Sequence, residues 1–366
     1  YGAWMRDEAE KRIGHLYPKA ALPDGSKATV IAWIWARTVT CPNPACGIAL
    51  PLVRSWWLGK KKSKEAYVIP SVVADASHPS GRRVQFAIGH DPQDAPTAST
   101  AGTVTRTGAA CLACQGAVPL AYVRAEGKAQ RLGETLMAVV AEGSRQRIYL
   151  PPTDRHRAAA DVSAPDDLPP GDLPDQALGF RVGGYGMTKF TDLFTHRQLV
   201  ALTTFSTLVS EARVRIAADG ASSAYADAVA TYLGLGVSRY TNFMNALCQW
   251  RPDAGKEQVG HLFTRQAIPM TWDFAEANPF SNSAGGWSPS FQFLPKAIDH
   301  LPSSGVASVL QQDARSDTAV AALLSTDPPY YDNIGYSDLS DFFYVWIRRP
   351  LRDVHPQLLS AVMLPM

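Results

Sequence analysis

The spacing of apolar residues predicts a helix at the start of the chain and a strand soon after it. In residues 3–16, apolar side chains such as Trp4 and Ile13 recur at helical spacing and share one side. The run 29–39 (TVIAWIWARTV) is apolar and rich in β-branched and aromatic residues, which favours a strand. Short strand-like segments separated by Gly, Pro, Asp and Ser then continue to about residue 124.

Helical spacing returns in the second half of the chain. Thr195 and Gln198 have the spacing of a capping box, in which each side chain satisfies a free backbone N–H at the start of a helix. The pattern predicts a helix from there to about residue 217, a second helix over 222–234 and a third over 239–249. The Pro-, Asp- and Gly-rich stretch 151–186 before them predicts a long loop or linker.

The last hundred residues have an α/β pattern. Two short apolar runs, 306–311 and 321–326, predict strands, and the second ends directly at Asp327. A helix is predicted over 337–349, capped by its first serine and stopped by Pro350.

The composition favours a folded protein of two or three domains. Of the 366 residues, 46% are hydrophobic and 19% are charged, which permits a packed core and excludes global disorder. The net charge of +2 is too small to indicate nucleic-acid binding by itself, so only a local cluster of basic residues can support it. No apolar run reaches the roughly 18–20 residues that span a bilayer. We therefore expect a cytoplasmic protein.

The sequence Asp327-Pro328-Pro329-Tyr330 is the strongest candidate for catalytic chemistry. A strand that ends in this motif would place a rigid loop at the carboxyl edge of a parallel sheet, where α/β proteins bind ligands. The prolines lack N–H groups, so the carbonyls of the loop remain free to accept hydrogen bonds from a ligand. Two acceptors can hold the exocyclic amine of a base, and the Tyr330 ring can stack on a flipped-out base. The alternative is an ordinary strand-end turn with an exposed tyrosine.

A second acidic residue precedes this motif. Asp313 follows the predicted strand 306–311 and lies 14 residues before Asp327, about the length of one sheet crossover. Methyltransferases commonly place an acid at such a position to contact the adenine of the cofactor. The alternative is a solvated acid in a loop.

Four of the five cysteines form two close pairs that are typical of a zinc site. Cys41 and Cys46 enclose four residues, whereas Cys111 and Cys114 enclose two. A glycine follows each pair closely, and such turns present thiolates for tetrahedral zinc. The alternative is a set of buried thiols without a metal. The fifth cysteine, Cys248, need not be catalytic. If the reaction moves a methyl group from a sulfonium donor to the amine of a base, no covalent cysteine intermediate is required.

Further candidates surround the cysteine pairs. His78 and His90 are spare metal ligands, although each is equally explained as a surface histidine. A basic run with neighbouring tryptophans can bind phosphates and stack on bases, or it can be a solvated loop. That run consists of Arg54, Lys60, Lys61, Lys62 and Lys64 beside Trp56 and Trp57.

The stretch 271–280 (TWDFAEANPF) is dense in acids and aromatic residues. We consider Asp273 and Asn278 candidates for the lining of a cofactor or base pocket. The alternative is a packed edge in which Asp273 acts as a cap.

Taken together, these segments resemble bacterial adenine-specific DNA methylases that contain a zinc ribbon, which are often associated with anti-phage or restriction systems. The stretch DPPYYDNIGYSDLSDFFY is the most specific match. The other matching stretches are YGAWMRDEAEKRIGHLYP, ARTVTCPNPACGIALPLVRSWWL, FTDLFTHRQLVALTTF and PMTWDFAEANPF.

The resemblance implies a doubly wound methyltransferase sheet, S-adenosylmethionine as the donor, and adenine N6 in DNA as the acceptor. DNA, and proteins of a defence system, are the implied partners. The resemblance carries Asp327, Pro328, Pro329 and Tyr330 over as the catalytic loop. It also carries over the four ligands of a structural Zn²⁺, which are Cys41, Cys46, Cys111 and Cys114.

The implied fold class is α/β: part of a doubly wound sheet, an inserted β-rich zinc ribbon and a helical segment. The expected division is 1–28 helical, 29–125 zinc ribbon, 126–190 irregular linker, 191–260 helical and 261–366 catalytic. The family's glycine-rich cofactor loop is absent from this chain, and the resemblance places it before residue 1. We therefore expect an internal piece of a longer enzyme, which can be inactive when isolated.

Two rival functions share these sequence features. One is an enzyme of the same fold that methylates RNA or cytosine N4, because its motif residues overlap with those found here. The other is a non-catalytic zinc-ribbon fragment that binds DNA or acts as a scaffold.

Overall fold

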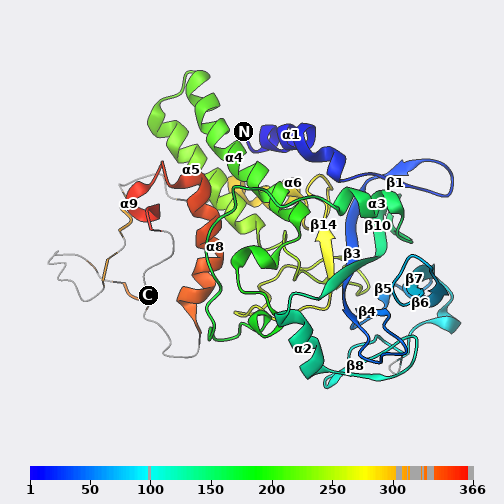
Figure 1. Cartoon of the computed structure of the whole chain (residues 1–366). Helices are drawn as coiled ribbons and strands as arrows, with labels where there is room; N and C mark the ends of the chain where they lie inside the picture. Colours follow the sequence, from blue (N-terminus) through cyan, green and yellow to red (C-terminus); the bar gives the residue numbers. More distant parts are fainter. Residues whose placement is uncertain are drawn as a thin grey trace.

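A curled antiparallel sheet with β3 at its centre organises the molecule (Figure 1). The computed structural model describes residues 1–97, 100–301, 307–310, 312–313, 323, 325–327 and 334–361. The strand order is β11–β10–β3–β14, and β4 also pairs with β3. The bounds of these strands are Val30–Thr40 for β3, Ala49–Leu52 for β4, Gly133–Gly143 for β10, Gln146–Leu150 for β11 and Asp273–Ala277 for β14.

Strand β3 confirms the prediction for residues 29–39, and its lack of apolar–polar alternation follows from its central place. Neighbouring side chains of a strand point to opposite faces, yet Trp33 and Ile34 are both buried. One edge of β3 pairs with β10, while β14 and β4 share the other edge, over Ala32–Ala36 and Arg37–Thr40. Two register shifts in the β3–β10 pairing mark irregularities of the bulge type, which bend a sheet.

Helices cover one side of this sheet. Helices α4 and α5 are consecutive and pack against each other; α1 packs on α4, and α8 packs on both (Figure 1). The longer helices are α1 (Gly2–Ile13), α4 (His196–Ala218), α5 (Ser223–Tyr240) and α8 (Tyr336–Leu351). The short ones are η1 (Gly14–Leu16), α6 (Trp287–Phe291), α7 (Phe293–Ile298) and α9 (Pro356–Leu359).

Four of the predicted helices are confirmed, and the helix predicted over 222–234 is α5, which extends to Tyr240. The segment 3–16 forms α1 and η1. Helix α4 begins with the predicted capping box: the Gln198 N–H donates to Thr195 Oγ1 over 3.1 Å, and the Thr195 N–H donates to Gln198 Oε1 over 2.9 Å. The helix predicted over 337–349 is α8, but its predicted ends are wrong: Ser337 lies inside the helix instead of capping it, and the helix continues through Pro350 by one residue.

The third helix of the central block, predicted over 239–249, is wrong. Helix α5 continues to Tyr240, and the chain then turns without forming a further helix before β12. The Asn245 side chain takes part in the turn: its amide donates to the Thr241 carbonyl, and its Oδ1 accepts from the Leu247 N–H. Side-chain hydrogen bonds of this kind offer the backbone an alternative to a helix.

Residues 126–190 do not form the irregular linker expected from the sequence. They include β10 and β11, which pair with each other, and β10 also pairs with β3 over most of its length. β10 is buried because it pairs with β3, about a hundred residues earlier in the chain. The sequence near β10 gives no sign of this partner. The rest of the segment contains α3 (Asp154–Ala160), η3 (Val182–Tyr185) and η4 (Phe190–Leu193), joined by the loop predicted within 151–186.

The cysteine-containing part lies at the lower right of Figure 1. It begins at the end of β3. The zinc ribbon expected over 29–125 therefore takes in β3 and β4, which belong to the central sheet, so residue 29 does not mark the start of a separate insertion. Its elements are β5 (Trp57–Gly59), β6 (Ala66–Ala74), β7 (Arg82–Gly89), η2 (Pro92–Asp94), β8 (Gly108–Ala110), β9 (Ala117–Pro119) and α2 (Leu120–Lys128). Two further two-stranded pairs are β1 (Ala20–Ala21) with β2 (Lys27–Ala28) and β12 (Trp250–Arg251) with β13 (Gln258–Val259).

The mixed α/β class is confirmed at this coarse level. Every strand pairing among the described residues is antiparallel, apart from one isolated parallel bridge between Phe180 and Ile268. The strands predicted over 306–311 and 321–326 fall largely outside the described residues. The described positions 307–310, 323 and 325–327 have no regular secondary structure.

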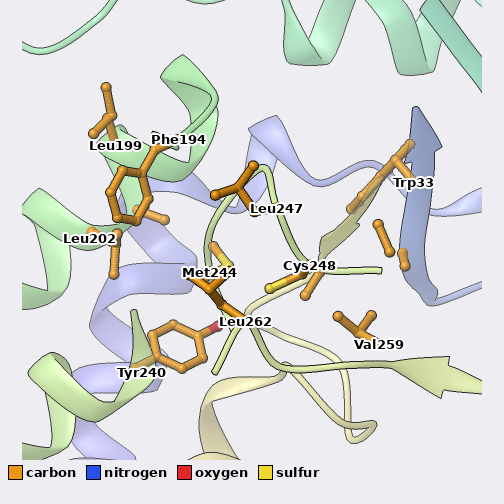
Figure 2. Packing of buried hydrophobic residues seen from close by; sticks show 14 of the residues in the cluster. Trp33, Phe194, Leu199, Leu202, Tyr240, Met244, Leu247, Cys248, Val259 and Leu262 are labelled. Atoms are coloured by element: carbon orange, nitrogen blue, oxygen red, sulfur yellow. The ribbon is translucent and has the colours of Figure 1, made fainter. Parts of the chain in front are cut away.

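The main apolar core lies between the sheet and the helices (Figure 2). It brings Trp33 of β3 together with Leu199 and Leu202 of α4 and with Met244 and Cys248 of the following turn. Cys248 is fully buried, and burial raises the pKa of its thiol to about 12. This cysteine therefore behaves as an apolar core residue. Among the described helices, none combines the length and the apolar character needed to cross a membrane.

Candidate metal centre and binding cavities

The four paired cysteines lie at the tips of two β-hairpins. Cys41 directly follows β3, and Cys46 precedes β4, which pairs back onto β3. Cys111 directly follows β8, and Cys114 precedes β9, the partner of β8. The hairpins bring the two pairs together across the long gap in sequence between them, as the predicted four-cysteine site requires.

The sulfur positions match a tetrahedral metal site. All four Sγ atoms lie within 4.8 Å of one another. The Sγ atoms of Cys41 and Cys114 are 3.8 Å apart, and those of Cys46 and Cys111 are 3.7 Å apart. A tetrahedral zinc with Zn–S bonds of about 2.3 Å separates its sulfurs by about 3.8 Å. A disulfide would need sulfurs about 2.05 Å apart. The cluster can therefore hold a metal ion such as zinc, in which role all four residues act as ligands.

The two turns reach this geometry in different ways. In the first turn, Gly47 adopts a left-handed conformation with φ of 55°, as expected for the glycine after a pair. In the second turn, Gln115 takes the left-handed position with φ of 59°. Gly116 instead makes room for the metal ligand, because a Cβ there would lie 3.2 Å from Cys114 Sγ.

The thiols differ in how readily they ionise. Hydrogen bonding from the Gly116 N–H, the largest cause, lowers the pKa of Cys114 to about 7. Burial raises the pKa of Cys41 to about 12 and also raises that of Cys111. Metal ligands must be thiolates, so a bound cation would offset the cost of ionising the buried members.

The two spare histidines have other partners. His78 Nδ1 lies 2.8 Å from Ser80 Oγ, and His90 Nδ1 lies 2.9 Å from the Glu65 carbonyl oxygen. Within the described part of the chain, only the four cysteines form a group of ligands suited to a metal.

The predicted basic run forms part of a larger positive surface. Lys60, Lys61, Lys62 and Lys64 are exposed, and Lys64 donates to Gln146 at the turn between β10 and β11. Arg145 of that turn and Arg147 of β11 line a 170 Å³ hollow with Lys61, Lys64 and His90. The neighbouring tryptophans differ: Trp56 is buried and cannot stack on a base, whereas Lys60 lies over the ring of the partly exposed Trp57.

A cavity of about 620 Å³ lies beside the sheet at the start of α4. Its wall includes Arg37 and Glu134, which face each other across β3 and β10 and form a 2.9 Å ion pair. Burial raises the pKa of Glu134, and Arg37 opposes this shift. Trp35 and Phe194 add aromatic surface to the same cavity. Charged groups beside aromatic rings suit a planar, polar ligand.

The stretch 271–280 lines this cavity with a residue other than the two expected. Glu276 lines it, whereas Asp273 and Asn278 do not. Asp273 Oδ1 accepts the Arg54 N–H, and burial raises the pKa of Asp273 to about 6. Asn278 bonds to the backbone on both sides of its amide: its Nδ2 donates to the Val30 carbonyl, and its Oδ1 accepts the Phe280 N–H.

Glu276 also forms a buried ion pair with Arg197. Both side chains are almost completely buried, and Arg197 donates to the two carboxylate oxygens over 2.9 and 2.7 Å. Thr195 Oγ1 and Trp35 Nε1 donate to the same carboxylate. The Arg197 guanidinium lies 4.3 Å from the centre of the Trp33 ring. This network joins the start of α4 to β3 and β14.

The sequence motif at 327–330 lies almost entirely outside the described residues. Asp327 is described and is exposed, without regular secondary structure, but the following Pro328, Pro329 and Tyr330 are outside the described part. Asp313 is likewise exposed and outside any strand. The predicted role of Asp313 in cofactor binding and the predicted catalytic role of the motif therefore stay predictions.

Sequence reasoning missed Arg37, Glu134, Arg197 and Glu276 as site residues. Glu134 and Arg37 meet only through the β3–β10 register, which the local sequence does not contain. An acid and an arginine 79 positions apart give no local signal either. Comparison with protein-family models, with curated proteins and with solved structures finds no match for this chain.

Proposed function

We propose that this chain is the acceptor-binding and DNA-contacting part of an S-adenosylmethionine-dependent DNA methyltransferase acting on adenine N6, which serves in restriction-modification or phage defence. The motif Asp327-Pro328-Pro329-Tyr330 carries this proposal, together with the sequence that continues from it into α8. The proposal rests on the chemistry of these residues and on the resemblance described above.

Features of the described structure support the placement of the motif near a binding cavity. Helix α8 follows the motif and is anchored by its buried residues Phe342 and Trp346. Phe194 stacks on Phe342, with ring centres 6.1 Å apart, and also lines the 620 Å³ cavity. The helix that follows the motif therefore packs against the wall of that cavity.

The DNA-binding part of the proposal draws on charge. The positive surface around Lys61 and Arg145 combines residues from two separate hairpins. Such a surface binds phosphates without regard to sequence and releases counterions, so its affinity falls steeply with salt. The four-cysteine cluster would hold the neighbouring hairpins in place through a structural zinc.

The chemistry assigned to this chain concerns the methyl acceptor. The Asp327 carboxylate and the Pro328 carbonyl would accept the two N–H groups of the adenine amine and thereby return electron density to its nitrogen. Tyr330 would stack on the flipped-out base. S-adenosylmethionine would supply the electrophilic methyl group. Neither Asp273 nor Asn278 lines the 620 Å³ cavity, so we assign no cofactor step to either.

Substitution of Asp327 tests the catalytic proposal. We expect Asp327→Ala to lower methyl transfer to adenine at least about a hundredfold, because one of the two acceptors is lost. The matched control is Asp299→Ala, which removes another exposed acid at the end of α7. Transfer of labelled methyl groups to defined oligonucleotides is measured for this chain and for the chain joined to a glycine-rich cofactor loop. Full activity of Asp327→Ala would contradict the proposal.

The same assay separates the rival substrates. Analysis of the methylated nucleosides distinguishes N6-methyladenine from N4-methylcytosine, and matched RNA strands test for an RNA substrate. Methyl transfer to either rival substrate, without transfer to adenine in DNA, would replace the proposed one.

A non-catalytic zinc-stabilised nucleic-acid-binding scaffold is the second candidate. The four-cysteine cluster and the antiparallel described sheet favour it, because a methyltransferase sheet is doubly wound and mostly parallel. Calorimetry with S-adenosylmethionine distinguishes the two. Salt-dependent DNA binding without cofactor binding, even in the extended protein, supports the scaffold.

A further inference from the structure

Three hairpin loops meet at the positive surface around Lys61. They are 60–65 between β5 and β6, 144–145 between β10 and β11, and 252–257 between β12 and β13. All three contribute side chains to the lining of the 170 Å³ hollow. Each loop joins two strands that pair with each other in an antiparallel ladder, so its base is fixed by that ladder.

Hydrogen bonds tie these loops to one another. The Lys60 N–H donates to the Pro252 carbonyl oxygen over 2.9 Å and so joins the first loop to the third. Arg147, in the strand that follows the second loop, donates through Nε to the Glu257 carbonyl oxygen over 3.2 Å. The cations of the surface are therefore carried by a preorganised set of loops, and binding a ligand there costs less ordering than binding it to a solvated loop.

The cations of this surface are available to a ligand. Lys61, Lys62 and Arg145 are exposed, and their side chains form no hydrogen bond or ion pair with the described part of the chain. The hollow is lined by four cationic side chains and by one carboxylate, that of Glu257, so its formal charge is +3 when His90 is neutral. A fixed surface with this charge attracts a polyanion.

The aromatic rings beside these loops favour a duplex over a single strand. Proteins bind single strands by stacking the bases on exposed aromatic rings. Trp56 is buried, and Trp57 is already in contact: Lys60 Nζ and the Tyr67 ring centre each lie 5.8 Å from the centre of its ring. Charge rather than stacking therefore dominates this surface, which suits the paired phosphate backbones of duplex DNA.

Arg145 stands at the tip of the shortest loop. Only two residues separate Gly143 from its ladder partner Gln146. The φ of Arg145 is 61°, in the left-handed region that glycine adopts readily and other residues adopt at a cost. Among the described residues, five other than glycine have a positive φ, and these loops contain three of them, Ser63, Arg145 and Glu257. Unfavourable backbone conformations of this kind gather at functional positions, and only Arg145 combines one with a cation.

The minor groove of duplex DNA suits a single arginine at a narrow tip. The groove is about 6 Å wide, whereas the two backbones of a hairpin already lie about 4.8 Å apart, so a side chain can enter and the hairpin cannot. Grooves rich in A·T pairs are narrow and have a strongly negative potential that attracts arginine. A guanidinium is more weakly hydrated than an ammonium, which favours arginine over lysine in such a groove.

We propose that Arg145 enters the minor groove of duplex DNA at A·T-rich sequence, while Lys61 and Lys64 bind the phosphates beside it. The inference rests on the proposal that this chain contacts DNA, and it adds the groove and the sequence preference. Arg145 senses the shape of the groove, and the two lysines contribute affinity without regard to sequence.

Two duplexes of equal length, one with an A·T centre and one with a G·C centre, test the groove contact. Their binding to the full chain is measured by fluorescence anisotropy at several salt concentrations, and we expect the A·T duplex to bind severalfold more tightly. Arg145→Lys keeps the charge and should lose most of that preference, because an ammonium retains its water. Arg145→Gly suits the left-handed backbone, so the loss of preference expected there does not come from an unfolded hairpin.

Two further variants serve as controls. Lys61→Ala should weaken binding of both duplexes equally and lower the slope of affinity against salt by about 1, as expected for one lost phosphate contact. Arg215→Lys changes a half-exposed arginine near the end of α4 and should alter neither affinity.

Several results would overturn the inference. They are equal affinity of the unmodified chain for the two duplexes, an A·T preference that survives in Arg145→Lys or in Arg145→Gly, and the absence of DNA binding. Tighter binding of a single strand or of an RNA duplex than of either DNA duplex would overturn it as well.

The failure of this inference is distinguishable from the failure of the proposed catalysis. Asp327→Ala should retain the A·T preference, because Asp327 does not line the positive hollow. If the Arg145 variants lose the preference but no methyl transfer is found, only the catalytic proposal fails. If methyl transfer is found but the two duplexes bind alike, only the groove contact fails.

Discussion

The tips of the two cysteine hairpins and the sheet beneath the helices are held together by different means. Around the thiols, the buried apolar cluster consists of Cys41, Cys46, Cys111 and a single other buried side chain, Ile48. The sheet and helices instead share a large core with many aromatic rings, such as the stacked Phe205 and Trp287. A small apolar cluster contributes little hydrophobic stabilisation, so we expect a metal bound by the four cysteines to stabilise the first region and to matter little for the second.

Removing the metal should give the largest difference in stability between the two regions. Structural zinc contributes about 10 kcal/mol or more to the folding of small zinc domains. We expect a chelator, or Cys46→Ser, to release β4 and the β8–β9 hairpin while β10 and β11 remain folded. Amide hydrogen exchange resolved by segment measures this difference, and metal analysis gives the zinc content.

Cys248→Ala is the matched control for this experiment. It removes the thiol that lies in the apolar core, so it should lower the stability of the sheet and helices and leave the metal content unchanged. Equal protection of the cysteine hairpins with and without metal would show that their apolar cluster suffices.

The buried ion pair should give the next largest effect, in the second region. Glu276→Gln leaves Arg197 without its charged partner, and breaking a buried pair in this way typically costs 3–5 kcal/mol, so we expect a loss of about 4 kcal/mol. Urea unfolding measures the loss. The double variant Arg197→Met/Glu276→Leu removes both charges and should be more stable than Glu276→Gln. A double variant at least as unstable as the single one would argue against this account.

His156 should make the second region sensitive to acid. Burial, followed by the nearby arginines, lowers the pKa of His156 to about 4. The unfolded chain takes up this proton near pH 6.5, whereas the folded chain resists it. Stability contributed by the neutral histidine is therefore present above pH 6.5 and is lost as the pH falls towards 4. The loss approaches about 3 kcal/mol.

The variant His156→Gln removes the titrating ring. We expect the stability of this variant to change less between pH 7 and pH 4.5 than that of the unmodified chain, as followed by urea unfolding at each pH. Parallel curves for the two proteins would assign the acid sensitivity to other groups.

The helix caps should give the smallest effects and refine the comparison within the helical region. Ser222 Oγ accepts the Tyr225 N–H at the exposed start of α5, so Ser222→Ala should cost about 1 kcal/mol. Thr195 caps α4 and also donates to the buried Glu276, so Thr195→Ala should cost more. Thermal unfolding compares the two variants, and equal losses would mean that the bond to Glu276 contributes nothing.

The local sequence determined the elements whose signals lie within a few residues. The apolar run of β3, the capping box at Thr195 and the helical spacing of α8 each specify an element, because backbone geometry links neighbouring positions. The spacing within each cysteine pair likewise specified a ligand turn, and the turns needed only hairpins to meet. The prediction that the motif at 327–330 is catalytic still rests on the sequence.

Only the tertiary structure decided which distant segments meet. It placed β10 beside β3, which turned an expected linker into the middle of the sheet and brought Glu134 opposite Arg37. It also joined Arg197 to Glu276 and set the arginines of α8 opposite Ser206. Such contacts depend on the packing of whole elements. The residues next to a given position in the sequence do not determine which distant residue it will contact.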